Sequence, residues 1–253
     1  MIQIDALTYS YTNGPPIFED FNWRVGRQES WAILGPSGCG KTTLLYLLAG
    51  LRFPSGGRIL IDGQDLTRPR PKTGLILQDY GLLPWASVRQ NAALGLRVRN
   101  FYGPDGTHSP RDFKQAGNVN PWLDRLGLLS QADKYPGQIS GGQRQRTAIA
   151  RTLVLQPDLL LMDEPFSSLD APTREGLQVL TRELAAEHEI TLILVTHAIE
   201  EAAFMGEKIL LLGNPPNRAA TVISNPDAGQ PDYRDSVEYQ QLCRELRSRL
   251  GEQ

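Results

Sequence analysis

Residues 35–42 read Gly-Pro-Ser-Gly-Cys-Gly-Lys-Thr, a spacing typical of a phosphate-binding loop. Glycines without a Cβ let backbone N–H groups approach an anion, and the N-terminus of the predicted following helix favours negative charge. Lys41 is expected to contact the β- and γ-phosphates of a nucleotide, and the Thr42 hydroxyl to ligate Mg²⁺. The complete predicted phosphate-binding set is Gly35, Pro36, Ser37, Gly38, Cys39, Gly40, Lys41, Thr42 and Thr43.

Two carboxylates follow an apolar run, residues 159–162, that suits a buried central strand. Asp163 and Glu164 would then lie at the carboxyl end of that strand, where ligand crevices of open α/β sheets are found. Asp163 is predicted to hold Mg²⁺, directly or through water. Glu164 is predicted to polarise the water that attacks the γ-phosphate.

The segment Ile-Ser-Gly-Gly-Gln, residues 139–143, precedes a predicted helix. Ser140 and the N–H groups of Gly141 and Gly142 would lie at its N-terminus, which favours an anion. The segment resembles the signature sequence of ATP-binding cassette (ABC) ATPases, with isoleucine where leucine is most common. The resemblance implies that these residues and Gln143 contact the γ-phosphate of ATP bound to a second copy, so that two chains enclose two nucleotides.

The resemblance continues at other positions. Gln78 resembles the glutamine that senses Mg²⁺ and water and links the nucleotide state to a partner. Asp170 ends a Ser-Leu-Asp segment that resembles the loop crossing the dimer interface, and His197 resembles the switch histidine that contacts the γ-phosphate. Tyr11 aligns with the aromatic residue that stacks on adenine. Tyr9 is a close competitor, and a plain role in a sheet is an open alternative for both tyrosines.

The resemblance covers about residues 2–212 and implies an α/β fold, with a P-loop (RecA-like) ABC ATPase core, an antiparallel β subdomain and a helical signature subdomain at about 80–155. The nucleotide-binding domain is expected to span 1–228, followed by a linker and a C-terminal helix in 229–253. Expected strands lie near 2–8, 19–25, 30–35, 58–61, 73–78, 159–162, 190–195, 208–212 and 219–223. Expected helices lie near 41–49, 88–98, 121–126, 141–155, 198–204 and 236–250, with a loop at 102–110.

Composition agrees with this interpretation. The 253 residues are 40% hydrophobic, enough for one large α/β domain with a substantial core, and the net charge of −2 gives no electrostatic case for nucleic acid as a partner. No apolar run approaches the length of a membrane span, and the first residues lack the basic start of a signal peptide. We therefore expect a cytosolic chain, and the family resemblance implies a peripheral position on the cytoplasmic face of the inner membrane.

The two cysteines, Cys39 and Cys243, form no metal-binding or redox spacing and are expected to be reduced thiols. Cys39 lies within the predicted phosphate-binding turn. The helix N-terminus that attracts phosphate would also favour a thiolate, so we expect Cys39 to react with maleimide and ATP to protect it.

The segment after Gln78 reads Asp-Tyr-Gly-Leu-Leu-Pro-Trp, and a little further on Asn-Ala-Ala-Leu-Gly-Leu follows. This stretch resembles cassettes of the nitrate/sulfonate/taurine importer group. Leu82, Leu83 and Trp85 would present apolar surface where the family docks a coupling helix of its membrane subunit, and Pro84 would keep the loop extended. Alternatively, the two leucines belong to the core and the tryptophan is a lone surface aromatic.

The sequence therefore predicts the ATP-hydrolysing subunit of a membrane importer, using ATP and Mg²⁺. Its implied partners are a second copy of itself, integral membrane permease subunits and, indirectly, an extracytoplasmic solute-binding protein, with a small anion such as a sulfonate, nitrate or taurine as solute. An ABC exporter or lipid-transport ATPase would use the same catalytic residues. A soluble ABC ATPase fits less well, because such proteins usually carry a tandem cassette, a coiled-coil insertion or a basic arm.

Overall fold

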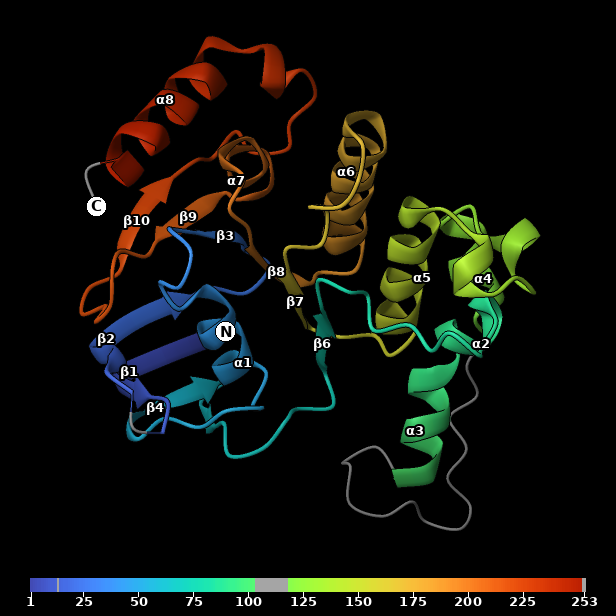
Figure 1. Cartoon of the computed structure of the whole chain (residues 1–253), viewed down its shortest axis with the longest axis horizontal. Helices are drawn as coiled ribbons and strands as arrows, with labels where there is room; N and C mark the ends of the chain where they lie inside the picture. The colour runs from blue at the N-terminus through green and yellow to red at the C-terminus, as the bar shows by residue number, and fades with distance from the viewer. Residues whose placement is uncertain (13, 103–117, 252–253) are drawn as a thin grey trace.

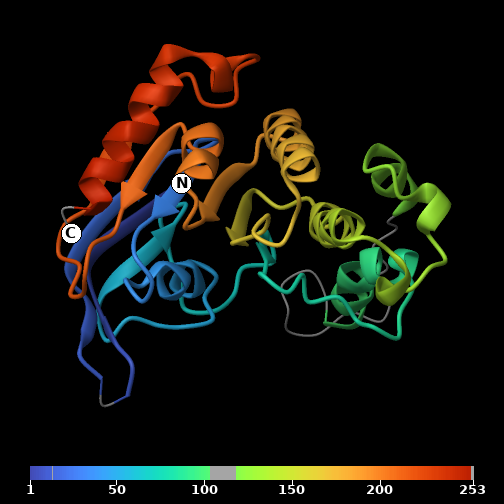
Figure 2. The same ribbon diagram turned by 45° about the horizontal axis from the view of Figure 1, so that its top comes forward.

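The computed structural model describes residues 1–12, 14–102 and 118–251; most of the loop expected at 102–110 lies outside the described residues. Two sheets and several helices form the described part of the molecule (Figures 1 and 2). The strands are β1 (Ile2–Ser10), β2 (Pro16–Val25), β3 (Ser30–Leu34), β4 (Gly56–Ile61), β5 (Gln64–Asp65), β6 (Thr73–Ile76), β7 (Leu159–Asp163), β8 (Thr191–Val195), β9 (Lys208–Leu211) and β10 (Thr221–Ser224). The helices are α1 (Lys41–Leu48), α2 (Val88–Ala92), α3 (Leu94–Tyr102), α4 (Asn120–Arg125), α5 (Gly141–Leu153), α6 (Ala171–Glu187), α7 (Ile199–Met205) and α8 (Val237–Gly251).

The larger sheet has the strand order β10-β9-β3-β8-β7-β6, in which only β10 is antiparallel to its neighbour. Every residue of β3, β7 and β8 is buried, because a parallel sheet is covered on both faces and its strands are mostly apolar. The carboxyl ends of these three strands meet at one edge of the sheet. The segments that follow them are therefore close in space although they are far apart in sequence.

The smaller, antiparallel sheet has the order β2-β1-β4-β5 and packs against α1 (Figure 1). Phe18 and Phe21 of β2 are fully buried with Leu44 and Leu48 of α1 in one apolar cluster. The expected α/β architecture with an antiparallel β subdomain is confirmed.

The signature-bearing part of the chain is helical, as expected. It contains α2 to α5, which lie beside β6 in both views (Figures 1 and 2). The single helix expected at 88–98 is wrong, because the structure interrupts it at Ala93. Just beyond the interruption, a Cβ on Gly95 would come within 2.8 Å of Leu155, so this glycine lets α3 approach the end of α5 closely. The strand expected to reach Gln78 ends earlier, at Ile76.

Helix α6 was not among the predicted helices, although the sequence carries its signals. Asp170 caps the helix by accepting a hydrogen bond from the Thr173 N–H at 3.1 Å, and proline occupies its first turn. Leu177, Thr181 and Leu184 recur at helical spacing and are buried. This helix connects the end of β7 to β8.

The C-terminal segment, defined as residues 229–251, packs on the core. Tyr233 is buried, and Leu242, Cys243 and Leu246 of α8 form an apolar cluster with residues of α7, β3 and β9. Figure 1 shows α8 alongside α7, β9 and β10. None of the helices in the described ranges, α8 included, combines the length and the apolar character needed to cross a bilayer.

Candidate active site

A cavity of about 400 Å³ opens at the carboxyl edge of the larger sheet. Its walls come from the smaller sheet, from the glycine-rich turn and the start of α1, and from the segments after β7 and β8. The lining residues are Tyr11, Ile17, Ser37, Gly38, Gly40, Lys41, Thr42, Thr43, Glu164 and His197. The structure thus brings together most of the predicted phosphate-binding turn, one predicted catalytic carboxylate and the predicted switch histidine. Gly35, Pro36 and Cys39 belong to the same turn but do not line the cavity.

The turn before α1 requires glycine at two positions. Gly40 has φ +107° where it caps the helix, and a Cβ there would lie 2.5 Å from Ile17 Cγ2. A Cβ on Gly35 would lie 2.4 Å from the carbonyl oxygen of Leu212 in the strand region alongside. Larger residues would therefore distort the turn that presents its N–H groups at the helix N-terminus.

Lys41 folds back onto the turn that carries it. Its Nζ donates hydrogen bonds to the carbonyl oxygens of Gly35 at 2.8 Å and Pro36 at 2.9 Å. The ammonium group is buried, and these two contacts are to carbonyl dipoles and not to a carboxylate. A bound phosphate would offer this cation a full negative charge.

A hydroxyl and a carboxylate meet at the start of α1. Thr42 Oγ1 donates a hydrogen bond to Asp163 Oδ1 at 3.1 Å, which joins α1 to the end of β7. Burial raises the pKa of Asp163; the Thr42 hydrogen bond opposes this, and the neighbouring Glu164 charge adds to it. Hydroxyl and carboxylate oxygens are the ligands that Mg²⁺ prefers, so these two side chains fit that ion.

Glu164 and His197 contact each other in the wall of the cavity. The Glu164 Oε1 and His197 Nδ1 atoms lie 3.1 Å apart. Glu164 has φ +45°, a left-handed conformation that is uncommon for a residue with a side chain, and its N–H donates to the Val195 carbonyl at 2.9 Å. This backbone bond between the ends of β7 and β8 holds the carboxylate beside the imidazole.

The geometry favours Tyr11 over Tyr9 as the aromatic residue of the cavity. Tyr9 is buried in the core, whereas Tyr11 is 41% exposed and lines the cavity. The Tyr11 hydroxyl lies 3.0 Å from Thr43 Oγ1. The two tyrosine rings meet edge to face with centroids 5.3 Å apart, so Tyr9 supports the ring that is available to a ligand.

The expectation of a reactive thiolate at Cys39 is wrong. The Cys39 side chain is buried in the apolar cluster beneath the turn and is 1% exposed. Burial raises the pKa of this thiol, and the nearby Lys41 charge opposes that effect without reversing it. A reagent in solution therefore meets a buried, protonated sulfur.

The predicted signature residues lie outside the cavity. Ser140 caps α5: its Oγ accepts from the Gln143 N–H at 3.3 Å, and Gln143 Oε1 accepts from the Ser140 N–H at 3.0 Å. Figures 1 and 2 place α5 and α1 on opposite sides of β7. Gln78 and Asp170 are exposed and do not line the cavity either.

Comparison with known proteins gives a consistent result. The family model described as ABC transporter matches residues 18–167. A taurine import ATP-binding protein of Pseudomonas aeruginosa is 42% identical over 202 residues, which are 80% of this chain and 73% of the relative. An aliphatic sulfonates import ATP-binding protein of Bacillus anthracis is 35% identical over 240 residues, which are 95% of this chain and 90% of the relative.

Solved structures agree with the sequence comparisons. A dimeric ATP-binding cassette in a post-hydrolysis state, bound to ADP and Pi, superimposes with a TM-score of 0.73 at 27% identity, covering 88% of this chain and 98% of the other. A cassette from Clostridium perfringens, part of an ABC transporter complex, gives a TM-score of 0.76 at 27% identity and covers 99% of this chain and 96% of the other. The chain therefore belongs to the ABC transporter family and is an ATP-binding, ATP-hydrolysing cassette of that family.

Proposed function

We propose that this chain powers an ABC importer for a small anion of the taurine, sulfonate or nitrate type. The sequence relatives support the importer class, because the taurine and aliphatic sulfonate relatives are named as import ATP-binding proteins. A nitrate import ATP-binding protein of Synechococcus elongatus is 38% identical over 239 residues, 93% of this chain and 35% of that longer relative.

The observation that carries the two-chain part of the proposal is the division of the site. One chain gathers the phosphate-binding turn, Glu164 and His197 in a single cavity, while Ser140 and the rest of the signature lie elsewhere. A helix N-terminus with unpaired N–H groups is suited to an anion. In our proposal the α5 N-terminus contacts the γ-phosphate held by a second copy, and the dimeric state of the solved cassettes supports this pairing.

Several residues in and beside the cavity have a place in the proposed mechanism. Lys41 leaves its carbonyl partners to bind the β- and γ-phosphates, and Tyr11 stacks on the adenine ring. Glu164 accepts a proton from the attacking water, and His197 orients that carboxylate and contacts the γ-phosphate. Thr42 and Asp163 would hold Mg²⁺, which neutralises phosphate charge when bound. Gln78 approaches the same region only when the two chains close.

A permease contact is proposed on the loop that begins after β6. Trp85 is 73% exposed, whereas Leu82 packs against the core of the helical region. The buried Asn91 side chain fixes this loop: its Oδ1 accepts from the Leu83 N–H at 2.8 Å, and its Nδ2 donates to the Ala86 carbonyl at 2.9 Å. The exposed Trp85 indole therefore belongs to a loop whose backbone is fixed by hydrogen bonds.

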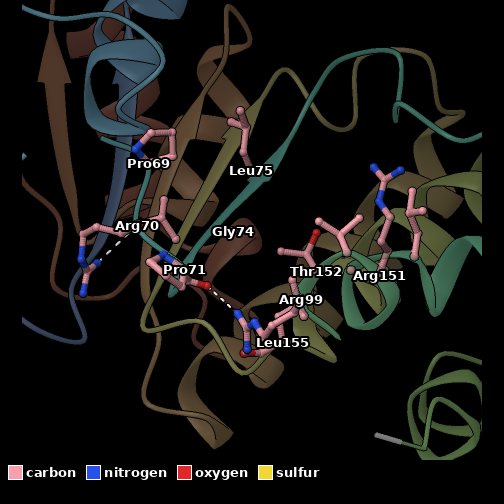
Figure 3. Close-up of a pocket in the computed structure, with 13 residues that line it drawn as sticks. Pro69, Arg70, Pro71, Gly74, Leu75, Arg99, Arg151, Thr152 and Leu155 are labelled. Atoms are coloured by element: carbon pink, nitrogen blue, oxygen red, sulfur yellow. Dashed lines mark hydrogen bonds between the residues drawn. The ribbon is translucent and has the colours of Figure 1, made fainter. Parts of the chain in front are cut away.

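A second cavity, of about 620 Å³, lies between β6, α3 and the end of α5 (Figure 3). Leu75, Val98 and Leu155 contribute apolar surface to it. Arg151 lines the cavity and also donates to the Tyr80 and Gly81 carbonyl oxygens, each at 2.6 Å. Arg151 thus connects the wall of this cavity to the start of the Trp85 loop, and we propose that a cytoplasmic helix of the permease contacts both.

The proposed assembly places the chain on the cytoplasmic face of the inner membrane. The permease and an extracytoplasmic solute-binding protein would choose the solute, because the cavity described here is built for a nucleotide.

Co-purification tests this proposal. Tagged Glu164→Gln protein would be expressed in the native cell, and the membranes solubilised with ATP and Mg²⁺ present. Recovery of a permease with import genes beside it is the expected result. Recovery of an exporter permease, or of soluble partners only, would overturn the importer proposal and leave the ATPase family assignment in place. Chelation with EDTA should abolish the co-purification if Mg²⁺ is needed for closure.

A further inference from the structure

A buried carboxylate that the proposed mechanism does not use lies next to the loop carrying His197. Glu201, on α7, is 5% exposed. Gln178 Nε2 of α6 donates a hydrogen bond to Glu201 Oε1 at 3.1 Å. Burial raises the pKa of Glu201, and the Gln178 hydrogen bond opposes that effect. A buried carboxyl group of this kind is stable only where its partners are fixed.

The start of α7 links this carboxylate to His197. Glu201 lies in the first turn of α7, and Ala198, the residue after His197, is the N-cap of that helix. Thr196 Oγ1 accepts the Ala198 N–H at 3.0 Å, and the Thr196 N–H donates to the Ile33 carbonyl at 3.1 Å. The residues on both sides of His197 are therefore tied through one hydroxyl. Displacement of Glu201 would release the turn that aims the imidazole at Glu164.

The orientation of the Gln178 amide is fixed by two partners, one a hydrogen-bond acceptor and the other a donor. Its Nε2 donates to Glu201, and its Oε1 accepts from the Arg234 guanidinium. A flipped amide would place Oε1 against the carboxylate and the NH₂ group against the guanidinium, so both contacts would become repulsive. Arg234 thus fixes the donor that Glu201 needs.

Arg234 belongs to the C-terminal segment and is itself held in place. Its guanidinium lies 3.6 Å from the centre of the Phe204 ring, a cation–π contact, and its NH1 is 3.8 Å from Glu175. The adjacent Tyr233 hydroxyl donates to Asn225 Oδ1 at 2.5 Å. The segment that follows the cassette therefore reaches back into the hydrogen-bond network of the switch loop.

We propose that Glu201 and Gln178 are positioning residues for His197, and that Arg234 completes the network, so that the C-terminal segment sets the rate of ATP turnover in this chain. The inference rests on the proposed role of His197. It predicts an effect on the chemical step and none on nucleotide affinity, because none of the three residues lines the nucleotide cavity.

The test is a double-mutant cycle on the purified full-length protein. Glu201→Gln, Gln178→Met and Arg234→Met are each made alone and with His197→Ala, and single-turnover ATP hydrolysis and KM for ATP are measured. We expect kcat to fall about tenfold for Glu201→Gln, the size of one hydrogen bond to a charged group, with KM within about twofold. In the His197→Ala background the same substitutions should cause no further loss.

Glu200→Gln is the matched control. Glu200 is the exposed neighbour of Glu201 on α7 and pairs with Arg247 of α8, so its substitution perturbs α7 without removing a contact of Glu201, Gln178 or Arg234. Its kcat should match that of the parent. If Glu201→Gln fails to fold, the test is made with Arg234→Met, because Arg234 is partly exposed in the C-terminal segment. We expect this variant to lose about threefold in kcat.

The outcomes separate the two hypotheses. The proposal would be overturned if kcat were unchanged in the Glu201, Gln178 and Arg234 variants. It would also be overturned if these substitutions lowered kcat equally with and without His197. Normal turnover of His197→Ala alone would instead overturn the proposed role of His197 and, with it, the basis of the inference.

Discussion

The Tyr80 hydroxyl lies 2.6 Å from Ser168 Oγ, so the loop proposed to meet a permease is hydrogen-bonded to the segment that leads into α6. Tyr80 has φ +61°, is buried, and is held through its carbonyl by Arg151 of α5. Ser168 is two residues before Asp170, in the segment proposed to meet a second copy. One hydrogen bond therefore connects the two proposed partner surfaces.

Tyr80→Phe should weaken that connection and leave ATP binding unchanged. The lost hydrogen bond corresponds to about 1 kcal/mol, or roughly fivefold, in the stimulation of ATP turnover by the permease complex. Ser168→Ala removes the same contact from the other side, so the double variant should lose no more than either single one. Additive losses in permease-stimulated phosphate release would contradict the coupling.

Glu164→Gln should retain ATP binding and lose about 100-fold or more in turnover, because the amide cannot accept the proton of the attacking water. Phosphate release measures turnover, and gel filtration with ATP should show an accumulated dimer. The amide preserves the shape of the side chain at this left-handed position. Substantial remaining turnover would remove Glu164 from the role of base.

Lys41→Ala should reduce ATP affinity about tenfold or more, since a charge-assisted contact to phosphate is lost. Calorimetric titration with ATP gives the affinity directly. Lys72→Ala is the control, because this lysine is exposed and lies outside the nucleotide cavity. Equal affinities for the two variants would contradict the assignment of the phosphate-binding turn.

Ser140→Ala should leave ATP binding to the monomer intact and impair dimer formation and turnover. The substitution also removes a helix cap, at about 1 kcal/mol of stability. Ser87→Ala is a matched control, because Ser87 caps α2 through the same reciprocal arrangement with Gln90. Only the Ser140 variant should fail to dimerise with ATP in the Glu164→Gln background; loss of ATP binding to the monomer would refute the two-chain site.

Trp85→Ala should lower affinity for solubilised permease by about 2 kcal/mol, as expected for a central aromatic anchor, and leave basal ATP turnover unchanged. Val222→Ala, at an exposed apolar position of β10, serves as the control. Retention of permease by both variants to the same extent would argue against docking through the Trp85 loop.

Local spacing was sufficient to predict the phosphate-binding turn, because glycine positions, a lysine and a hydroxyl lie within eight consecutive residues. Glu164 and His197 were predicted as site residues from separate segments, and the structure brings both to one cavity because they follow buried parallel strands whose carboxyl ends meet. The roles of these residues and the domain boundary at residue 228 stay predictions.

Other features depend on contacts that spacing does not reveal. The burial of Cys39 follows from packing of the smaller sheet on α1, and that packing outweighs the effect of the helix N-terminus. The link between Gln178 and Arg234 joins residues 56 positions apart and exists only because the C-terminal segment folds back. Helix α6 was not predicted, although Asp170 caps it and Leu177, Thr181 and Leu184 recur at helical spacing.

The four hydrogen bonds of the Asn91 amide have a consequence for recognition. A loop that is already ordered loses little conformational freedom when a partner binds, so the contact area of Trp85 is converted into affinity with a small entropic penalty. Replacement of Asn91 would leave the indole chemically intact and yet weaken the complex, mainly by lowering the fraction of molecules in which the loop has the shape that a partner can bind.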